Sequence, residues 1–87
     1  MAYTVELRPS AEKQLDKLPA QLRERIIRRL EELEIQPRPR EARKVAGRED
    51  FYRVRVGDYR IVYELHDRIL LVLVIRIGHR REVYRGL

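Results

Sequence analysis

Residues 51–63 of this chain read FYRVRVGDYRIVY, two runs of alternating side chains separated by Gly57-Asp58. A two-residue connection that contains glycine is typical of a β-hairpin, because glycine readily takes the positive φ that such turns require. The sequence therefore predicts strands over residues 51–56 and 59–65, joined by a tight turn.

The turn also fixes which residues of the two strands lie opposite each other, and therefore which side chains share a face. The predicted pairs are Val56–Tyr59, Arg55–Arg60, Val54–Ile61, Arg53–Val62 and Tyr52–Tyr63. One face then carries apolar and aromatic side chains for helices to cover, namely Tyr52, Val54, Val56, Tyr59, Ile61 and Tyr63. The opposite face carries Arg53, Arg55 and Arg60.

The segment before the hairpin predicts one strand and two helices. Apolar side chains alternate with polar ones over residues 3–7, the pattern of a half-buried strand. We expect Ser10 to cap a short helix that runs to about Lys17, and Pro19 to end it and open a second helix over residues 20–34. The second helix has an apolar stripe at helical spacing, formed by Leu22, Ile26, Leu30 and Leu33.

After the hairpin, residues 69–77 form a run that is apolar on both faces, which favours a central strand covered on both sides. We expect a turn around residues 66–68 to join this strand to the hairpin. The predicted fold is a single small α+β domain over residues 1–87, ordered β-α-α-β-β-β. It has a mainly antiparallel sheet with a helical hairpin packed on one face.

The length of 87 residues suits one domain with a thin core. No cysteine is present, which excludes disulfides and thiolate sites, and two histidines, His66 and His79, are too few for a histidine metal cage. We therefore expect no metal and no cofactor. The N-terminus lacks a targeting pattern and no apolar run approaches the roughly 20 residues of a membrane helix, so we expect a cytoplasmic protein without membrane contact.

The charge balance favours a polyanionic partner. Lysine and arginine total 20 against 14 acidic residues, a net charge of +6, and most of the basic residues are arginine. Arginine suits multidentate contacts with phosphate and stacking on bases. The alternative is a solvated surface with many ion pairs. For the charged residues of the second helix, we favour the solvated face over docking on RNA or a ribosome.

Arg53, Arg55 and Arg60 on the open face of the hairpin form the main functional hypothesis. Like charges directly opposite each other destabilise a sheet by a few tenths of a kcal/mol to about 1 kcal/mol, so Arg55 across from Arg60 is costly for a purely structural surface. We interpret the three side chains as a phosphate cradle. Two alternatives stay open: the guanidinium groups splay apart into solvent, or Glu64 on the same face neutralises them.

The C-terminal segment adds other groups that RNA cleavage needs: a base for the 2′-hydroxyl, cations for the phosphorane and an acid for the leaving oxygen. In residues 77–85, Gly78 lets the chain bend, and Tyr84 is a candidate base if neighbouring positive charge favours the phenolate. His79 is a candidate base or acid. The structural alternatives are a packing aromatic and a turn residue. Three further arginines lie in the same segment: Arg80, Arg81 and Arg85.

The run YRVRVGDYRIVYE over residues 52–64, followed by IGHR over residues 77–80 and EVY over residues 82–84, resembles the RelE branch of the RelE/ParE toxin superfamily. The resemblance covers essentially the whole chain. It implies a toxin of a type II toxin–antitoxin system that cleaves messenger RNA on the ribosome and is blocked by a cognate antitoxin. The implied reaction is a metal-free transesterification by the 2′-hydroxyl.

For individual residues, the resemblance implies that Arg60 holds the scissile phosphate, that Arg80 stabilises charge and protonates the leaving group, and that Tyr84 activates the 2′-hydroxyl. Arg53 and Arg55 stand where the best-known bacterial member has lysines, so an electrostatic catalytic role carries over. The residues expected to bind RNA are Arg53, Arg55, Arg60, His79, Arg81 and Arg85.

Two other functions stay open. A ParE-like toxin would inhibit DNA gyrase by binding without hydrolysis, although such chains usually lack the tyrosine and much of the basic cluster. An inactive member would remain as a nucleic-acid-binding module. The mode of antitoxin neutralisation is also open, because the chain ends at Leu87, three residues after Tyr84, whereas relatives often continue into a C-terminal tail that the antitoxin displaces.

Overall fold

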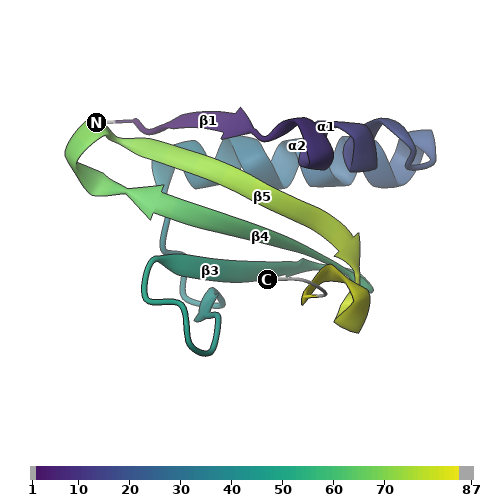
Figure 1. Cartoon of the computed structure of the whole chain (residues 1–87). Coiled ribbons are helices and arrows are strands. Elements are labelled where there is room, and N and C mark those ends of the chain that lie inside the picture. Colours follow the sequence, from purple (N-terminus) through teal and green to yellow (C-terminus); the bar gives the residue numbers. More distant parts are fainter. Residues whose placement is uncertain (1, 85–87) are drawn as a thin grey trace.

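The computed structural model describes residues 2–84, apart from the side chain of Arg81. Its elements are β1 (Thr4–Leu7), α1 (Pro9–Asp16), α2 (Ala20–Ile35), β2 (Arg43–Lys44), β3 (Phe51–Val56), β4 (Tyr59–His66), the 3-10 helix η1 (Asp67–Ile69), β5 (Leu71–His79) and the 3-10 helix η2 (Arg80–Tyr84). The strands form one sheet in the order β1-β5-β4-β3-β2, and only the β1–β5 pair is parallel (Figure 1). The predicted α+β fold is confirmed; β2, η1 and η2 are additions to it.

The β3–β4 hairpin has the predicted register. All five predicted pairs are present, including Arg55 opposite Arg60, and Gly57 takes a φ of +60° in the turn. The apolar face packs against the helices as predicted. Tyr63 on this face is fully buried, and its hydroxyl donates a hydrogen bond to the carbonyl oxygen of Pro37 at 2.7 Å. Burial of this tyrosine therefore leaves no polar atom unpaired.

The two helices bury one stripe each in the main core between them and the sheet. The buried members are Ala11, Leu15, Ile26, Leu30 and Leu33. Pro19 separates the helices as predicted. The prediction that Ser10 caps α1 is wrong: the helix begins at Pro9, because proline suits the first helical position, where its missing N–H is not needed. Within residues 2–84, no helix is long and apolar enough to cross a membrane.

Strand β5 is central, between β1 and β4, but it begins and ends two residues later than predicted. The cause is the connection that precedes it. Asp67–Ile69 forms η1, and Leu70 takes a φ of +52°, which is incompatible with an extended strand. The strand can therefore begin only at Leu71.

A β-bulge interrupts the pairing of β4 with β5. Val62 lies opposite Arg76, whereas the next residue, Tyr63, lies opposite Val74. The extra residue on β5 is Ile75, which is buried on the face opposite the helices. Because a bulge breaks the alternation of side chains, Arg76 also lies on that face.

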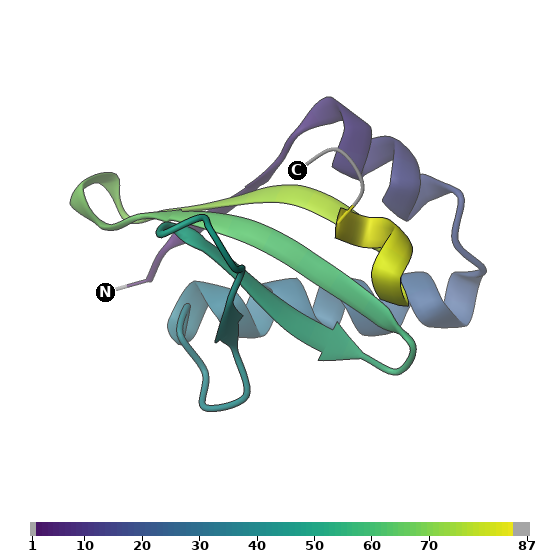
Figure 2. The ribbon, with the colours of Figure 1, turned by 60° about the horizontal axis from the view of Figure 1, so that its bottom comes forward.

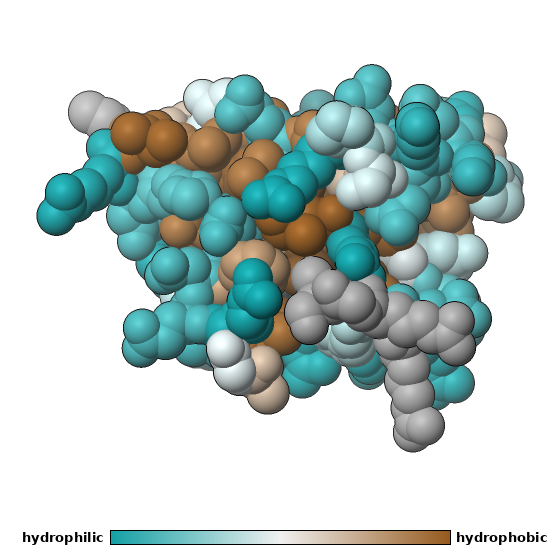
Figure 3. Space-filling model, viewed as in Figure 1, coloured by the Kyte–Doolittle hydropathy of each residue, from teal (hydrophilic) through white to brown (hydrophobic). Residues whose placement is uncertain are grey.

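A second, smaller core covers the face of the sheet opposite the helices. Its buried members are Phe51, Val62, Ile75 and Val83. Val83 belongs to η2, which folds back over the ends of β4 and β5 (Figure 2). The space-filling view shows apolar residues exposed near the middle of this face of the molecule, with hydrophilic residues around them (Figure 3).

Gly78 has a role different from the predicted one. It stays within β5, and the chain turns instead at Arg80, which has a φ of +37°. A Cβ atom at Gly78 would lie 3.4 Å from the side chain of Val83. The missing side chain therefore lets η2 pack closely on the strand.

An ion pair ties the loop after α2 to the β4–β5 turn. Asp67 accepts hydrogen bonds from Arg38 at 2.7 and 3.1 Å and from the hydroxyl of Tyr3 at 2.7 Å. Arg38 also donates to the hydroxyl of Tyr52 at 3.1 Å. Because Arg38 and then Tyr3 hydrogen-bond to the ionised carboxylate, the pKa of Asp67 is lowered to about 2.

We expect Asp67→Asn to remove an acid-sensitive part of the stability. The folded-state pKa lies below the unfolded value of about 3.9, so the ion pair stabilises the fold above about pH 4 and this stabilisation is lost as the pH falls towards 2. Melting temperatures of the wild type and the variant should therefore converge at the acid end of a pH series. A gap that stays constant across the series would contradict this assignment.

Candidate functional site

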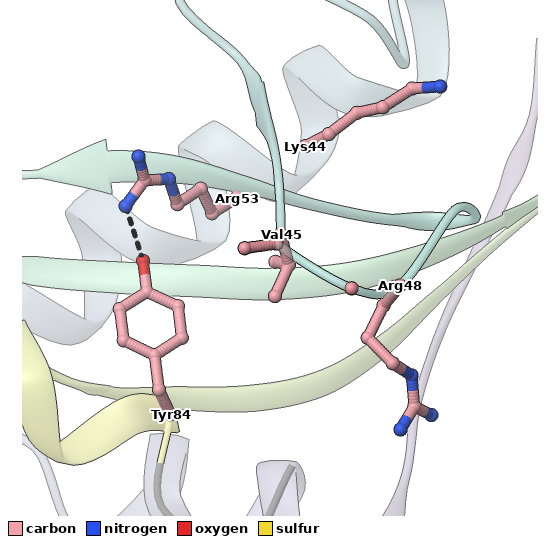
Figure 4. A pocket seen from close by; sticks show the side chains of 7 residues that line it. Lys44, Val45, Arg48, Arg53 and Tyr84 are labelled. Carbon is pink, nitrogen blue, oxygen red and sulfur yellow. Dashed lines mark hydrogen bonds between the residues drawn. The ribbon is translucent and has the colours of Figure 1, made fainter.

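The phenol of Tyr84 lies over the arginine face of the hairpin. Its hydroxyl oxygen accepts a hydrogen bond from Nη1 of Arg53 at 3.0 Å and another from Nη1 of Arg60 at 3.4 Å. Each guanidinium carbon lies 5.8 Å from the centre of the tyrosine ring. Figure 4 shows Arg53 directed at the tyrosine hydroxyl. We call Arg53, Arg60 and Tyr84 the phenol cluster; both of its guanidinium groups donate to the same oxygen.

Arg55 lies next to the phenol cluster, but the side-chain hydrogen bonds to the phenol in residues 2–84 come from Arg53 and Arg60. Arg55 is exposed, and it lines an open hollow of about 350 Å³ together with Arg53 and Arg60. Glu41 and Arg43 complete the lining. The three arginines of this face therefore border one hollow, although only two of them converge on the phenol.

The acidic residues of this region have other partners. Glu64 contacts Nε2 of His66 at 2.9 Å, and Glu41 pairs with Arg29. Within residues 2–84, no carboxylate forms a salt bridge with the three arginines of the hairpin face. The alternative in which Glu64 neutralises these arginines is therefore wrong. In the same part of the chain, no three His, Cys, Asp or Glu side chains are grouped to hold a metal ion.

Arg80 is the first residue of η2, directly after β5, and lies near Arg60. With Arg60, His79 and Glu82 it lines a hollow of about 580 Å³. Its positive φ is uncommon for a residue with a side chain. The N–H of Arg80 donates to the carbonyl oxygen of Asp58 in the hairpin turn at 2.9 Å, and this hydrogen bond helps to hold the backbone in that conformation.

His79 packs against a different tyrosine from the one in the phenol cluster. Its ring meets Tyr59 edge-on, with the ring centres 5.4 Å apart, and Tyr59 packs on the main core. The structure therefore brings His79 near Arg80 but not onto the phenol of Tyr84. The side chain of Arg81 and the whole of Arg85 lie outside the described residues.

Comparison with known proteins shows which family the chain belongs to. Residues 5–84 match the family model described as the ParE toxin of a type II toxin–antitoxin system. The chain is 36% identical over 88 residues to the mRNA interferase toxin RelE of Escherichia coli K12, with 97% of this chain and 92% of that protein covered. The chain belongs to the RelE/ParE toxin superfamily.

Solved structures of RelE share the fold of this RelE-like toxin. Free E. coli RelE with two arginines mutated to alanine has a TM-score of 0.83 and 33% identity, over 97% of this chain and 92% of that one. The toxin–antitoxin complex RelBE of E. coli contains a chain with a TM-score of 0.81 and 32% identity, over 92% and 99%.

Arg76 is a site residue of this RelE-like toxin that the sequence did not reveal. It is half-buried, and its Nη1 donates to the carbonyl oxygen of Val83 at 3.4 Å. This contact holds the backbone directly before Tyr84. In a regular strand, Ile75 and Arg76 would lie on opposite faces of the sheet. The β-bulge puts both on the face opposite the helices, so the sequence pattern alone does not predict the position of Arg76.

A cavity of about 500 Å³ adjoins the phenol cluster (Figure 4). The lining residues are Lys44, Val45, Ala46, Gly47, Arg48, Arg53 and Tyr84. Val45 and Tyr84 both pack against the second core, so this core supports both walls. The sequence pattern does not indicate the cavity, because its walls come from distant segments that meet only in the fold.

Proposed function

We propose that this toxin is an endoribonuclease that cleaves messenger RNA on the ribosome through attack of a 2′-hydroxyl on the adjacent phosphate. The observation that carries the proposal is the phenol cluster, in which two arginines donate to one tyrosine oxygen on an open sheet face. In the reaction a bond from the 2′ oxygen to phosphorus forms and the bond to the 5′ oxygen breaks, which leaves a 2′,3′-cyclic phosphate. The name of the E. coli relative, an mRNA interferase, supports the same substrate.

Tyr84 acts as the general base and takes the proton of the 2′-hydroxyl. To act as a base, Tyr84 must carry a negative charge on its phenol oxygen. Hydrogen bonds from Arg53 and Arg60 to this oxygen would stabilise that charge. The same arginines, with Arg55, then face the phosphorane, on which further negative charge develops. Guanidinium groups match phosphate oxygens in planar geometry, so arginine side chains supply the cations of the site.

Arg80 serves the leaving 5′ oxygen. In-line displacement puts the attacking and leaving oxygens on opposite sides of phosphorus. Arg60 donates a hydrogen bond to Tyr84 and also lines the hollow that Arg80 and His79 border, so one arginine links the two groups. We assign charge stabilisation and protonation of the leaving oxygen to Arg80. We also assign contacts with the RNA backbone to His79, and to Arg81 and Arg85, whose side chains lie outside the described residues.

An open site favours a substrate that is held in place by a larger partner. The hollows around the phenol cluster lie on the surface of the sheet, so this chain encloses little of its RNA. A translating ribosome in the cytoplasm holds the message along a fixed path and supplies the missing alignment. A cognate antitoxin completes the system: E. coli RelE has been solved as a toxin–antitoxin complex, and a net charge of +6 suits an acidic antitoxin segment.

Cell-free translation with the purified protein tests this function. Primer extension on the message should reveal cuts in phase with codons, and only when ribosomes translate it. An intact message together with arrested gyrase supercoiling would favour a ParE-like inhibitor. An intact message with unimpaired gyrase would favour the inactive nucleic-acid-binding member.

Val83→Ala should lower the cleavage rate, because it removes packing that positions the neighbouring Tyr84. Val83 is 2% exposed in the second core, and the truncation costs roughly 2 kcal/mol of folding free energy. Val72→Ala is the matched control, since Val72 is equally buried on β5 but lies in the main core. At a temperature where both variants are folded, the cleavage rate should fall further for Val83→Ala. Equal rates would mean that the second core does not position Tyr84.

A further inference from the structure

The cavity beside the phenol cluster has a shape and a lining that the proposed cleavage chemistry does not use. Arg53 and Tyr84 form one side of it, and the loop of residues 44–48 forms the other. In Figure 4, Val45 belongs to this second side, and its side chain lies between Tyr84 and Arg48. A nucleotide whose phosphate meets Arg53 therefore has room for its base in this cavity, against the apolar surface of Val45 and Ala46.

The loop that forms the outer wall has a defined conformation. The N–H of Arg48 donates to the carbonyl oxygen of Val45 at 3.1 Å, which closes a turn. Gly47 takes a φ of +78° within that turn, a conformation that residues with side chains rarely adopt. Val45 anchors the loop in the second core. The position of Arg48 is therefore set by the fold.

The side chain of Arg48 is held in a way that leaves its donors available. Its guanidinium carbon lies 4.4 Å from the centre of the Phe51 ring, and Phe51 is buried in the second core. Stacking on an aromatic ring covers one face of the guanidinium but not the N–H groups at its edge. Within residues 2–84, no carboxylate forms a salt bridge with Arg48.

Such an arginine discriminates among bases through its planar fork of donors. Guanine presents two acceptors on one edge, O6 and N7, and a bidentate contact from arginine to this pair is the commonest specific arginine–base contact. Adenine places a donor beside N7, and the pyrimidines have no such pair of acceptors. Guanine is therefore the base whose edge best fits Arg48.

We propose that this cavity binds the base of a nucleotide that flanks the scissile phosphate, and that Arg48 selects guanine there. The inference deepens the proposed function, because it rests on RNA as the substrate. It makes Arg48 a specificity-determining residue at a distance from the proton transfers, which belong to Tyr84 and Arg80.

Binding of short RNAs that cannot be cleaved tests the proposal separately from catalysis. The probes are fluorescein-labelled tetranucleotides of 2′-O-methyl uridine in which the second or the third base is replaced by guanine, adenine or cytosine. Fluorescence anisotropy should show that one of the two guanine probes binds the wild type roughly tenfold more tightly than its adenine, cytosine and uracil counterparts.

The matched variants are Arg48→Met and Arg68→Met. Methionine keeps an unbranched side chain over Phe51 but removes the donors, so Arg48→Met should bind all four bases alike at that position. Arg68 is an exposed arginine of η1, and Arg68→Met should keep the guanine preference. Equal affinity of the wild type for all probes, or a guanine preference that survives Arg48→Met, would overturn the proposal. Guanine-selective binding by a protein that leaves messages intact would support the base site and refute the proposed cleavage.

Discussion

Replacing Tyr84 by phenylalanine should lower the rate of message cleavage by about 10²- to 10⁴-fold, the range typical of a lost general base. The substitution removes only the hydroxyl oxygen that accepts hydrogen bonds from Arg53 and Arg60. The ring can keep its contacts with both guanidinium groups, 5.8 Å from its centre. The fold should therefore survive, and the loss should report on the chemistry. Single-turnover cleavage on programmed ribosomes measures it.

Tyr3→Phe is the matched control for Tyr84→Phe. Tyr3 also loses a hydrogen-bonded hydroxyl, the one that donates to Asp67, but near the β4–β5 turn, at the opposite end of the sheet from η2 (Figure 1). Its cleavage rate should stay close to that of the wild type. If Tyr84→Phe cleaved as fast as Tyr3→Phe, the phenol would not be the base, and His79 would be the next candidate to test.

Arg60→Gln should lower cleavage by about 10²- to 10³-fold, as expected when a group that stabilises transition-state charge is lost. Arg60 is the residue that joins the parts of the site. It donates to Tyr84, it borders one hollow with Arg55, and it borders the other with Arg80. Glutamine keeps some hydrogen-bonding capacity but removes the positive charge. The same single-turnover assay separates this loss from weaker binding of the ribosome.

The control for Arg60→Gln is Arg68→Gln, which removes one positive charge from η1 and should leave cleavage near the wild-type rate. Arg60→Lys should recover only part of the lost activity, because a single ammonium cannot reproduce the planar set of donors. Equal cleavage by Arg60→Gln and Arg68→Gln would mean that net charge, and not the place of Arg60, is what matters.

The hairpin and its arginine face are predictable because one short turn determines them. Gly57 accepts the positive φ, the turn fixes the register, and the register assigns each side chain to a face. The convergence of Arg53 and Arg60 could be anticipated from this register. Their contact with Tyr84 could not, because it depends on how η2 folds back over the sheet.

The features that escaped prediction arise where tertiary packing overrides local pattern. The bulge at Ile75 breaks the alternation on which the face assignment of Arg76 depends. A glycine at position 78 suggests a bend in the chain, but in the structure its missing side chain lets Val83 pack closely on β5. The cavity beside Tyr84 likewise depends on a second core that joins four separate segments. No local sequence pattern predicts that these four segments pack together.

The arginine face lowers the folding stability of the protein. Arg55 lies directly opposite Arg60, and an opposed pair of like charges costs up to about 1 kcal/mol in a sheet. Within residues 2–84, no carboxylate offsets either charge through a salt bridge. This cost is understandable if the face is completed by an anion, and phosphate is the anion that the proposed reaction provides.

The ends of the cleaved message test the proposed chemistry most directly. Attack by the 2′-hydroxyl should leave a 2′,3′-cyclic phosphate on the upstream fragment and a 5′-hydroxyl on the downstream fragment, both of which mass spectrometry of the cut message identifies. A 3′-hydroxyl facing a 5′-phosphate would mean that water is the nucleophile, and it would contradict the role given to Tyr84, Arg53 and Arg60.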